Sequence, residues 1–405
     1  MNKKVILLGI PHLDWALLKF ILREKTFRGF RKLFKNCWYG EIVPQHDPPS
    51  TPVEFTTIVT GVKKEYHKIG YGKYSDGEYV NRGRIYSRLD IKAKPIWELA
   101  LEHGKSVGIY NWLLTWPAKR INGFMITGRT SQNEENKAYP GWLMAELKKL
   151  SHPDFFDGHF AFSLIKEFDV DFFLGMEERA HGPSHEYWRA FEEGKKFAIK
   201  KLINCFKEVD CFLSLCLEKL KDWVILIVSE SGMKKREYPI YTLGNEIIDF
   251  FRKLNIGVQL YATDIYPPTL PKNTPAIYLP SKRKKRKKII KILNSVRYKE
   301  SDRPFIKNIK WVDDFLSFSF NFHPSYVKYR SGNFYLTLPN GEEFRMWVIK
   351  QTGSSNNTGG VFLMNSPKLE KKNLNKVSTL DIAPTILKLL HLPVPKYMKG
   401  KVVVQ

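Results

Sequence analysis

The stretch WVILIVSESGMKK, from Trp223 to Lys235, decides the fold class. Its run of apolar, mostly β-branched residues ends abruptly at Glu230, Ser231 and Gly232. Such a run is typical of a strand that is buried on both faces of a parallel sheet. The polar residues that follow it then lie at the carboxyl edge, where open α/β folds place their ligand sites. The stretch therefore predicts an α/β fold with a site near Glu230.

Similar strand patterns alternate with helix patterns through residues 1–237. The strand-like segments are KVILLGI, SVGIYNW and DVDFFLGM, and each is separated from the next by amphipathic helical sequence. This alternation predicts a mostly parallel sheet with helices on both faces.

The regular alternation of strand and helix patterns stops between residues 238 and 344. This segment contains the proline-rich YPPTLPKNTP, a basic run, and an alternating pattern with a turn at Asn340-Gly341 that predicts a hairpin. After it, GGVFLMNSP and STLDIAPTILKLLHLPVP return to strand-then-helix. We predict a discontinuous core, 1–237 and 345–405, interrupted by an inserted α/β cap over 238–344.

Hydropathy argues against a membrane span. The chain has 405 residues, 43% of them hydrophobic, and no apolar run long enough to cross a bilayer. The opening MNKKVILLGIPHLDW has an apolar part of only Val5 to Ile10, which is too short for a signal peptide. We therefore predict a cytoplasmic protein. The sequence does not indicate an oligomeric state.

The charge of the chain is strongly positive. Lys and Arg number 66 against 41 Asp and Glu, which gives a formal net charge of +25. The densest basic run is Lys282, Arg283, Lys284, Lys285, Arg286, Lys287 and Lys288. It is either the solvated start of a helix or a contact for nucleic acid or another anionic surface. No nucleic-acid-binding fold signature surrounds it.

The segment TPVEFTTIVTG, which begins at Thr51, has the pattern of a helix N-terminus. Thr51, Pro52 and Glu54 match a capping box with proline in the first turn, so we predict that Thr51 caps the helix and that Glu54 completes the box. A helix N-terminus also favours a bound anion. Thr51 is therefore either a plain cap or part of an anion site.

Three long segments resemble the type I phosphodiesterase/nucleotide pyrophosphatase family of the alkaline phosphatase superfamily. They are TPVEFTTIVTGVKKEYHKIG, VGIYNWLLTWPAKRINGFMITG and STLDIAPTILKLLHLPVPKYMKGKVV, and the resemblance of the chain as a whole runs nearly end to end. The resemblance implies an alkaline-phosphatase-like three-layer sandwich. It also implies two divalent metals, usually zinc, and a threonine or serine nucleophile that attacks phosphorus.

The family's site residues map onto this chain only in part. Thr51 occupies the nucleophile position. Of the six metal-ligand positions, Glu177, His181 and Glu230 keep a ligand-capable side chain, and Pro11, Ser231 and Asn356 do not. The resemblance therefore implies an eroded metal site.

Other residues near these positions affect the expected chemistry. Glu54 occupies a position where the family has an asparagine that contacts a phosphoryl oxygen, and a carboxylate there repels phosphate. His12, His46, Asp47 and His185 could replace lost ligands, although ordinary loop or surface roles are expected for them.

We derive three functional hypotheses from these observations. The first is a catalytically degenerate family member that holds one metal ion or none and that binds a phosphate ester or another anionic ligand. The second is an active metal-dependent phosphoesterase with Thr51 as nucleophile, a remodelled site on Glu177, His181 and Glu230, and zinc or another divalent metal. The third is a polyanion binder that works through the run from Lys282 to Lys288.

Overall fold

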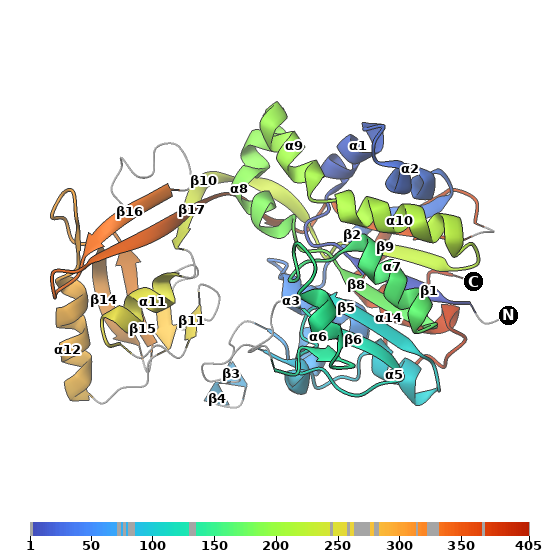
Figure 1. Cartoon of the computed structure of the whole chain (residues 1–405), viewed down its shortest axis with the longest axis horizontal. Helices are drawn as coiled ribbons and strands as arrows, with labels where there is room; N and C mark the ends of the chain where they lie inside the picture. The colour runs from blue at the N-terminus through green and yellow to red at the C-terminus, as the bar shows by residue number, and fades with distance from the viewer. Residues whose placement is uncertain are drawn as a thin grey trace. The chain divides into compact units, whose positions relative to one another are not determined.

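The structure, a computed structural model, describes most of the chain. The described residues are 3–70, 74–75, 78–79, 86–128, 135–243, 246–256, 260–262, 276–278, 283–312, 315–321, 332–366 and 369–404. They form two compact units (Figure 1). The first contains Met1–Ile69, Tyr86–Glu237 and Thr352–Gln405, and the second contains Gly70–Ile85 and Tyr238–Gln351.

The first unit is built on a nine-stranded sheet with the order β19-β2-β18-β9-β1-β8-β5-β6-β7. Its strands are β1 (Val5–Gly9), β2 (Cys37–Val43), β5 (Val107–Trp112), β6 (Gly123–Thr127), β7 (Ala138–Tyr139), β8 (Phe172–Met176), β9 (Val224–Val228), β18 (Gly360–Asn365) and β19 (Lys372–Ser378). The central strands, β9 to β6 in this order, are parallel. β18 is antiparallel to both of its neighbours, and β7 is antiparallel to β6. The predicted α/β fold with a mostly parallel sheet is confirmed.

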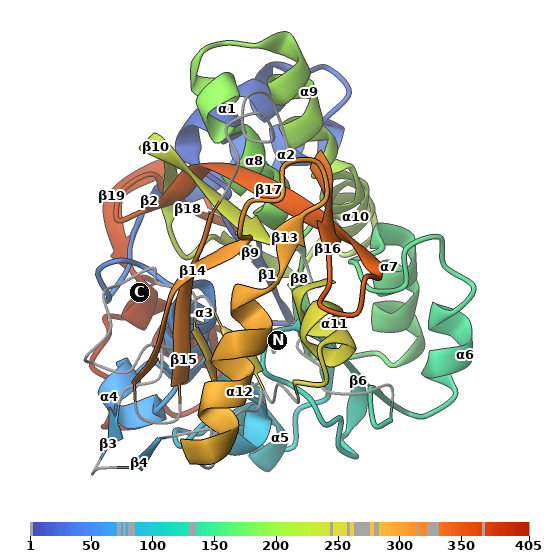
Figure 2. The ribbon, with the colours of Figure 1, turned by 90° about the vertical axis from the view of Figure 1, so that its left-hand side faces the viewer.

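Helices cover both faces of this sheet, because side chains alternate along the strands. On β1, Ile6 and Leu8 join one hydrophobic cluster, and Val5 and Leu7 join the other. The first cluster includes residues of α1 (Trp15–Arg23), α2 (Arg28–Lys35), α6 (Leu143–Leu147), α7 (Gly158–Glu167), α8 (His181–Glu192), α9 (Lys196–Asn204) and α10 (Lys207–Lys219). The second includes residues of α3 (Thr51–Thr60), α5 (Ile96–Glu102) and α14 (Ile382–Leu389). The result is a three-layer sandwich (Figures 1 and 2).

The second unit has its own core, which contains Phe250, Leu293 and Phe305. One sheet has the order β10-β17-β16-β13 and the other has the order β11-β12-β15-β14. Their strands are β10 (Gly232–Leu243), β11 (Leu260–Ala262), β12 (Ala276–Tyr278), β13 (Arg297–Tyr298), β14 (Ile306–Val312), β15 (Phe315–Phe320), β16 (Gly332–Thr337) and β17 (Glu343–Asn356), and the helices are α11 (Glu246–Lys253) and α12 (Arg283–Asn294). β16 and β17 form the predicted hairpin, in which Gly341 N–H donates to Leu338 O.

The remaining short elements are α4 (Lys64–His67), β3 (Tyr74–Ser75), β4 (Glu78–Tyr79) and the 3-10 turns η1 (Arg88–Asp90) and η2 (Thr379–Asp381). In the part of the chain that the structure describes, no helix combines the length and the hydropathy that a membrane crossing requires.

The basic run forms the start of α12. Lys282 lies outside the described residues, as do the side chains of Arg283 and Lys284. Further along the run, Lys285, Lys287 and Lys288 are exposed. The guanidinium of Arg286 lies 4.5 Å from the centre of the Trp311 ring, a cation–π contact.

Candidate functional site

Three neighbouring parallel strands bring the predicted site residues to one edge of the large sheet. In the register of the sheet, Gly9 at the end of β1 is opposite Met176 at the end of β8 and Val228 at the end of β9. The residues that follow these strands therefore meet at the carboxyl edge. They include His12 after β1 and Glu230 after β9.

Thr51 is the first residue of α3, and its hydroxyl points at Glu230. Thr51 Oγ1 donates a hydrogen bond of 2.7 Å to Glu230 Oε1, and both residues are buried. The N-cap is Ser50, whose side chain makes no capping bond. The predicted capping box of Thr51 and Glu54 is therefore wrong, because both side chains have partners elsewhere in the fold.

Glu230 is a fully buried carboxylate with two neighbours in the site. Its Oε2 accepts a hydrogen bond of 3.3 Å from the backbone N–H of His12, and its Oε1 lies 3.8 Å from His12 Nε2. Burial raises the pKa of Glu230 to about 7, against the opposing effect of the Thr51 hydrogen bond. One carboxyl group thus connects the threonine hydroxyl to a histidine.

Glu54 lies in the first turn of α3, as Thr51 does, and both oxygens of its carboxylate accept hydrogen bonds. Oε1 accepts hydrogen bonds from the backbone N–H groups of Gln45 and His46, both at 2.9 Å, and from His46 Nδ1 at 2.6 Å. Oε2 accepts from Thr379 Oγ1 at 2.8 Å. The carboxylate therefore joins the start of α3 to the chain after β2 and to η2.

Glu177, which follows β8, is held by Arg179. Its Oε1 accepts from the backbone N–H of Arg179 at 2.6 Å, and its Oε2 accepts from Arg179 Nη1 at 3.1 Å. Arg179 Nη2 also donates to Phe156 O at 2.8 Å. Burial raises the pKa of Glu177 to about 8, and the guanidinium opposes that rise.

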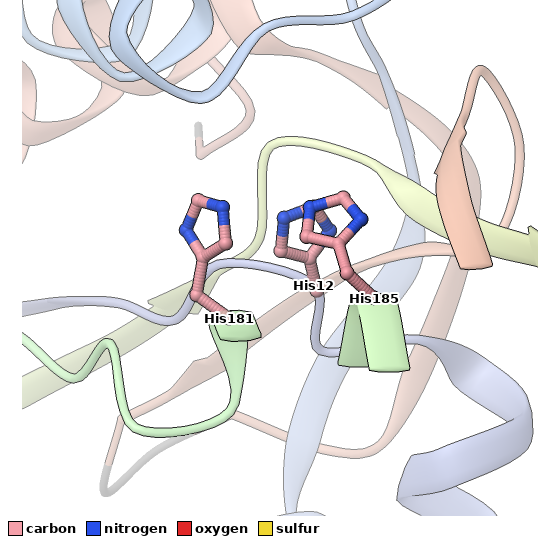
Figure 3. Close-up of side chains that lie close together, drawn as sticks. All are labelled: His12, His181 and His185. Atoms are coloured by element: carbon pink, nitrogen blue, oxygen red, sulfur yellow. The ribbon is translucent and has the colours of Figure 1, made fainter. Parts of the chain in front are cut away.

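Three histidines gather at the same edge of the sheet (Figure 3). His12 follows β1, and His181 and His185 lie one turn apart on α8. The ring centre of His12 lies 4.6 Å from that of His181 and 4.8 Å from that of His185, and the ring centres of His181 and His185 are 5.3 Å apart. In the described part of the chain, this is the one group of His, Cys, Asp or Glu with the arrangement of a metal site, and Glu177 lies outside it.

Burial sets the charge state of this cluster. The pKa of His12 is well below its usual value because the ring is buried, and the nearby His181 and His185 lower it further. The pKa of His185 is also lowered, chiefly by burial. Both rings are therefore neutral near pH 7.

From the sequence, ordinary loop or surface roles were expected for His12 and His185, and the structure instead places both in this cluster. The spacing of His181 and His185 was an available signal, because residues four apart face the same side of a helix. The position of His12, immediately after the first strand, was another.

A model of the family described as type I phosphodiesterase/nucleotide pyrophosphatase matches residues 5–311. The chain belongs to this family. Two solved structures of murine ectonucleotide pyrophosphatase/phosphodiesterase 5 are similar at 14% identity. One, an inactive variant in complex with AMP, has a TM-score of 0.53 and covers 99% of this chain and 98% of that chain. The other has a TM-score of 0.52 with 98% of both chains covered. A search of curated proteins gave no match.

The two metals of the type I phosphodiesterase family do not fit the residues at the ligand positions of this chain. Pro11 offers no ligand atom, and Ser231 has a hydroxyl in place of an imidazole. The amide of Asn356 donates to Thr358 Oγ1 at 2.7 Å. Glu177 is engaged by its own neighbour, Arg179. This donor set is too poor for a pair of divalent cations, whose ligands are carboxylates and imidazoles.

Proposed function

We propose that this chain is a phosphate-ester hydrolase in which Thr51 is the nucleophile and Glu230 accepts its proton. The observation that carries the proposal is the 2.7 Å hydrogen bond from Thr51 Oγ1 to Glu230 Oε1. A threonine hydroxyl is a weak nucleophile unless an adjacent base removes its proton, and a buried carboxylate within hydrogen-bond distance meets that requirement.

The position of Thr51 also suits an anionic substrate. It begins a helix of ten residues. The first N–H groups of a helix have no acceptor within the helix, and the helix dipole places partial positive charge there. A phosphoryl group at this point lies within reach of the hydroxyl. The AMP in the murine relative supports a phosphate ester as the class of substrate.

The reaction then proceeds in two steps. Thr51 Oγ1 forms a bond to phosphorus, its proton moves to Glu230, and the bond from phosphorus to the leaving oxygen breaks as that oxygen takes the proton. In the second step Glu230 takes a proton from water, the water oxygen attacks the phosphothreonine, and Thr51 Oγ1 leaves with the proton.

The test of this proposal is the trapping of the phosphothreonine. The protein is mixed with p-nitrophenyl phosphate or bis-p-nitrophenyl phosphate, with and without added zinc, quenched in acid and digested for mass spectrometry. We expect a phosphoryl group on Thr51, no label in Thr51→Ala, and unchanged labelling in Thr56→Ala. Thr56 is a matched control because its hydroxyl bonds to Pro52 O within the same helix.

A second candidate is a degenerate family member that binds a phosphate ester without turnover. The loss of ligand side chains at Pro11, Ser231 and Asn356 favours it. It predicts that the unaltered protein binds AMP but releases p-nitrophenol no faster than Thr51→Ala. That result would overturn the hydrolase proposal.

The exposed lysines of α12 keep anionic-surface binding as an additional proposed property. Replacing Lys285, Lys287 and Lys288 with glutamine is expected to weaken binding to double-stranded DNA about tenfold or more at low salt, since each phosphate contact releases counterions. Electrophoretic mobility shifts at several salt concentrations measure this. Equal affinity of the two proteins would remove α12 as the contact.

A further inference from the structure

The buried ring of His12 has no hydrogen-bond partner on either nitrogen among the described residues. The residue is fully buried and adopts a left-handed backbone conformation with φ of 61°. That conformation is uncommon for a residue with a side chain, and an unsatisfied buried polar group costs about 1–3 kcal/mol. A ligand that accepts electron pairs from imidazole would offset these costs.

The ring of His185 is fixed with one nitrogen available. Its Nδ1 lies 3.1 Å from Gly353 O. Because a carbonyl oxygen only accepts, Nδ1 carries the proton and Nε2 keeps its lone pair. Metal-binding histidines are usually oriented in this way, by a hydrogen bond from the other ring nitrogen. A Cβ on residue 353 would lie 2.6 Å from Ser184 O, so the absence of a side chain lets this carbonyl approach α8.

The spacing of the three rings matches a single ion. The ligand nitrogens of His12, His181 and His185 all lie within 4.8 Å of one another. Around tetrahedral zinc, nitrogens at about 2.1 Å from the ion are about 3.4 Å apart, so small rotations of the rings close the site. Three histidines leave a fourth position open.

We propose that His12, His181 and His185 bind one divalent transition-metal ion of the zinc class. Imidazole ligands suit zinc, copper and nickel better than magnesium or calcium. Of these residues, only His181 occupies a ligand position of the family, so the site is distinct from the family's metal pair. Glu230 Oε1, at 3.8 Å from His12 Nε2, lies beside the site and adds negative charge.

An ion at this position would also assist the proposed hydrolysis. This part of the inference rests on the proposed function, whereas the binding of the ion does not. The surroundings of Thr51 contain the carboxylates of Glu230 and Glu54, which repel a phosphate. A divalent ion held by the three histidines would supply positive charge near Glu230 and would stabilise negative charge on a phosphoryl oxygen.

The proposal is tested by metal binding alone. Protein stripped with a chelator is titrated with zinc in a calorimeter, and with cobalt(II) while the visible absorption is recorded. We expect one equivalent to bind, with the intense absorption of tetrahedral cobalt. His185→Ala and His12→Ala are each expected to weaken binding about a hundredfold or more. Circular dichroism checks the fold, and if His12→Ala does not fold then His185→Ala decides.

Two control variants show whether the ion sits on the histidine cluster. Asn356→Ala, at a family ligand position outside the cluster, and His103→Ala, at an exposed histidine, are both expected to keep the affinity. Binding that survives His185→Ala, or that requires two equivalents, overturns the proposal. If the protein binds metal but forms no phosphothreonine, the metal site stands and the proposed hydrolase function is wrong. If it forms phosphothreonine but binds no metal, the hydrolase function stands and the metal site is wrong.

Discussion

Replacing Glu230 with glutamine is expected to lower kcat for phosphate-ester hydrolysis about a thousandfold. The amide keeps the size of the side chain and still accepts the hydrogen bond from Thr51 Oγ1, but it cannot take the proton. KM is expected to fall slightly, because the neutral amide removes a negative charge that repels the phosphate beside Thr51. Initial rates of p-nitrophenol release over a range of substrate concentrations separate the two constants.

Glu177→Gln is the matched control for this experiment. Glu177 is also a buried glutamate that follows a central strand, but its carboxylate is bonded to Arg179 and lies outside the histidine cluster. We expect Glu177→Gln to keep kcat within about threefold. If Glu230→Gln retains the full rate, Glu230 is not the proton acceptor, and the reaction must be assigned to another group.

Replacing Glu54 with alanine is expected to lower the free energy of unfolding by about 4 kcal/mol. Hydrogen bonds to a charged group contribute about 1.5–3 kcal/mol each, and the partly buried donors of Gln45 and His46 and the buried hydroxyl of Thr379 lose their acceptor together. The sum is reduced because water can enter and satisfy part of the loss. Urea unfolding followed by fluorescence measures the change.

Thr379→Val is the reference variant, because it shows how much stability is lost with a single hydrogen bond to Glu54. Valine matches threonine in shape and removes only the single hydrogen bond to Glu54 Oε2, so a loss of about 1 kcal/mol is expected. A loss in Glu54→Ala no greater than that of Thr379→Val would contradict the view that this carboxylate organises the start of α3.

The large sheet was predictable because its strands are buried on both faces. Val224–Val228 is a continuous apolar run. Because successive residues of a strand face opposite sides of the sheet, five buried residues in a row require a hydrophobic core on both sides. The order of the strands in the sheet could not be predicted from the sequence. β18 lies between β9 and β2, and no local pattern states which strands will be neighbours.

The error at Thr51 and Glu54 has a clear physical cause. The local pattern matched a capping box, but the partners of Glu54 come from Gln45, His46 and, 325 positions away, Thr379. These tertiary contacts outcompete a local bond that contributes about 1 kcal/mol. A single sequence contains no signal for them.

The histidine cluster shows a similar limit. His12 is separated from His181 and His185 by most of the first unit, and their meeting depends on the parallel pairing of β1 with β8. The sequence supplied the residue types but not the distances. By contrast, the resemblance to the family pointed to Thr51 and Glu230, and the structure places these two side chains in contact.

The position of β18 also has a consequence for biosynthesis. β2 is made early, yet its two neighbours in the sheet, β18 and β19, are among the last segments to leave the ribosome. Asn365 bonds to Asn36 across a separation of 329 positions. Until β18 and β19 have been synthesised, both edges of β2 are unpaired in the nascent polypeptide, and unpaired strand edges are templates for aggregation. Nascent chains stalled before residue 360 should therefore bind chaperones that recognise exposed strands, and release of the full-length product should end that binding.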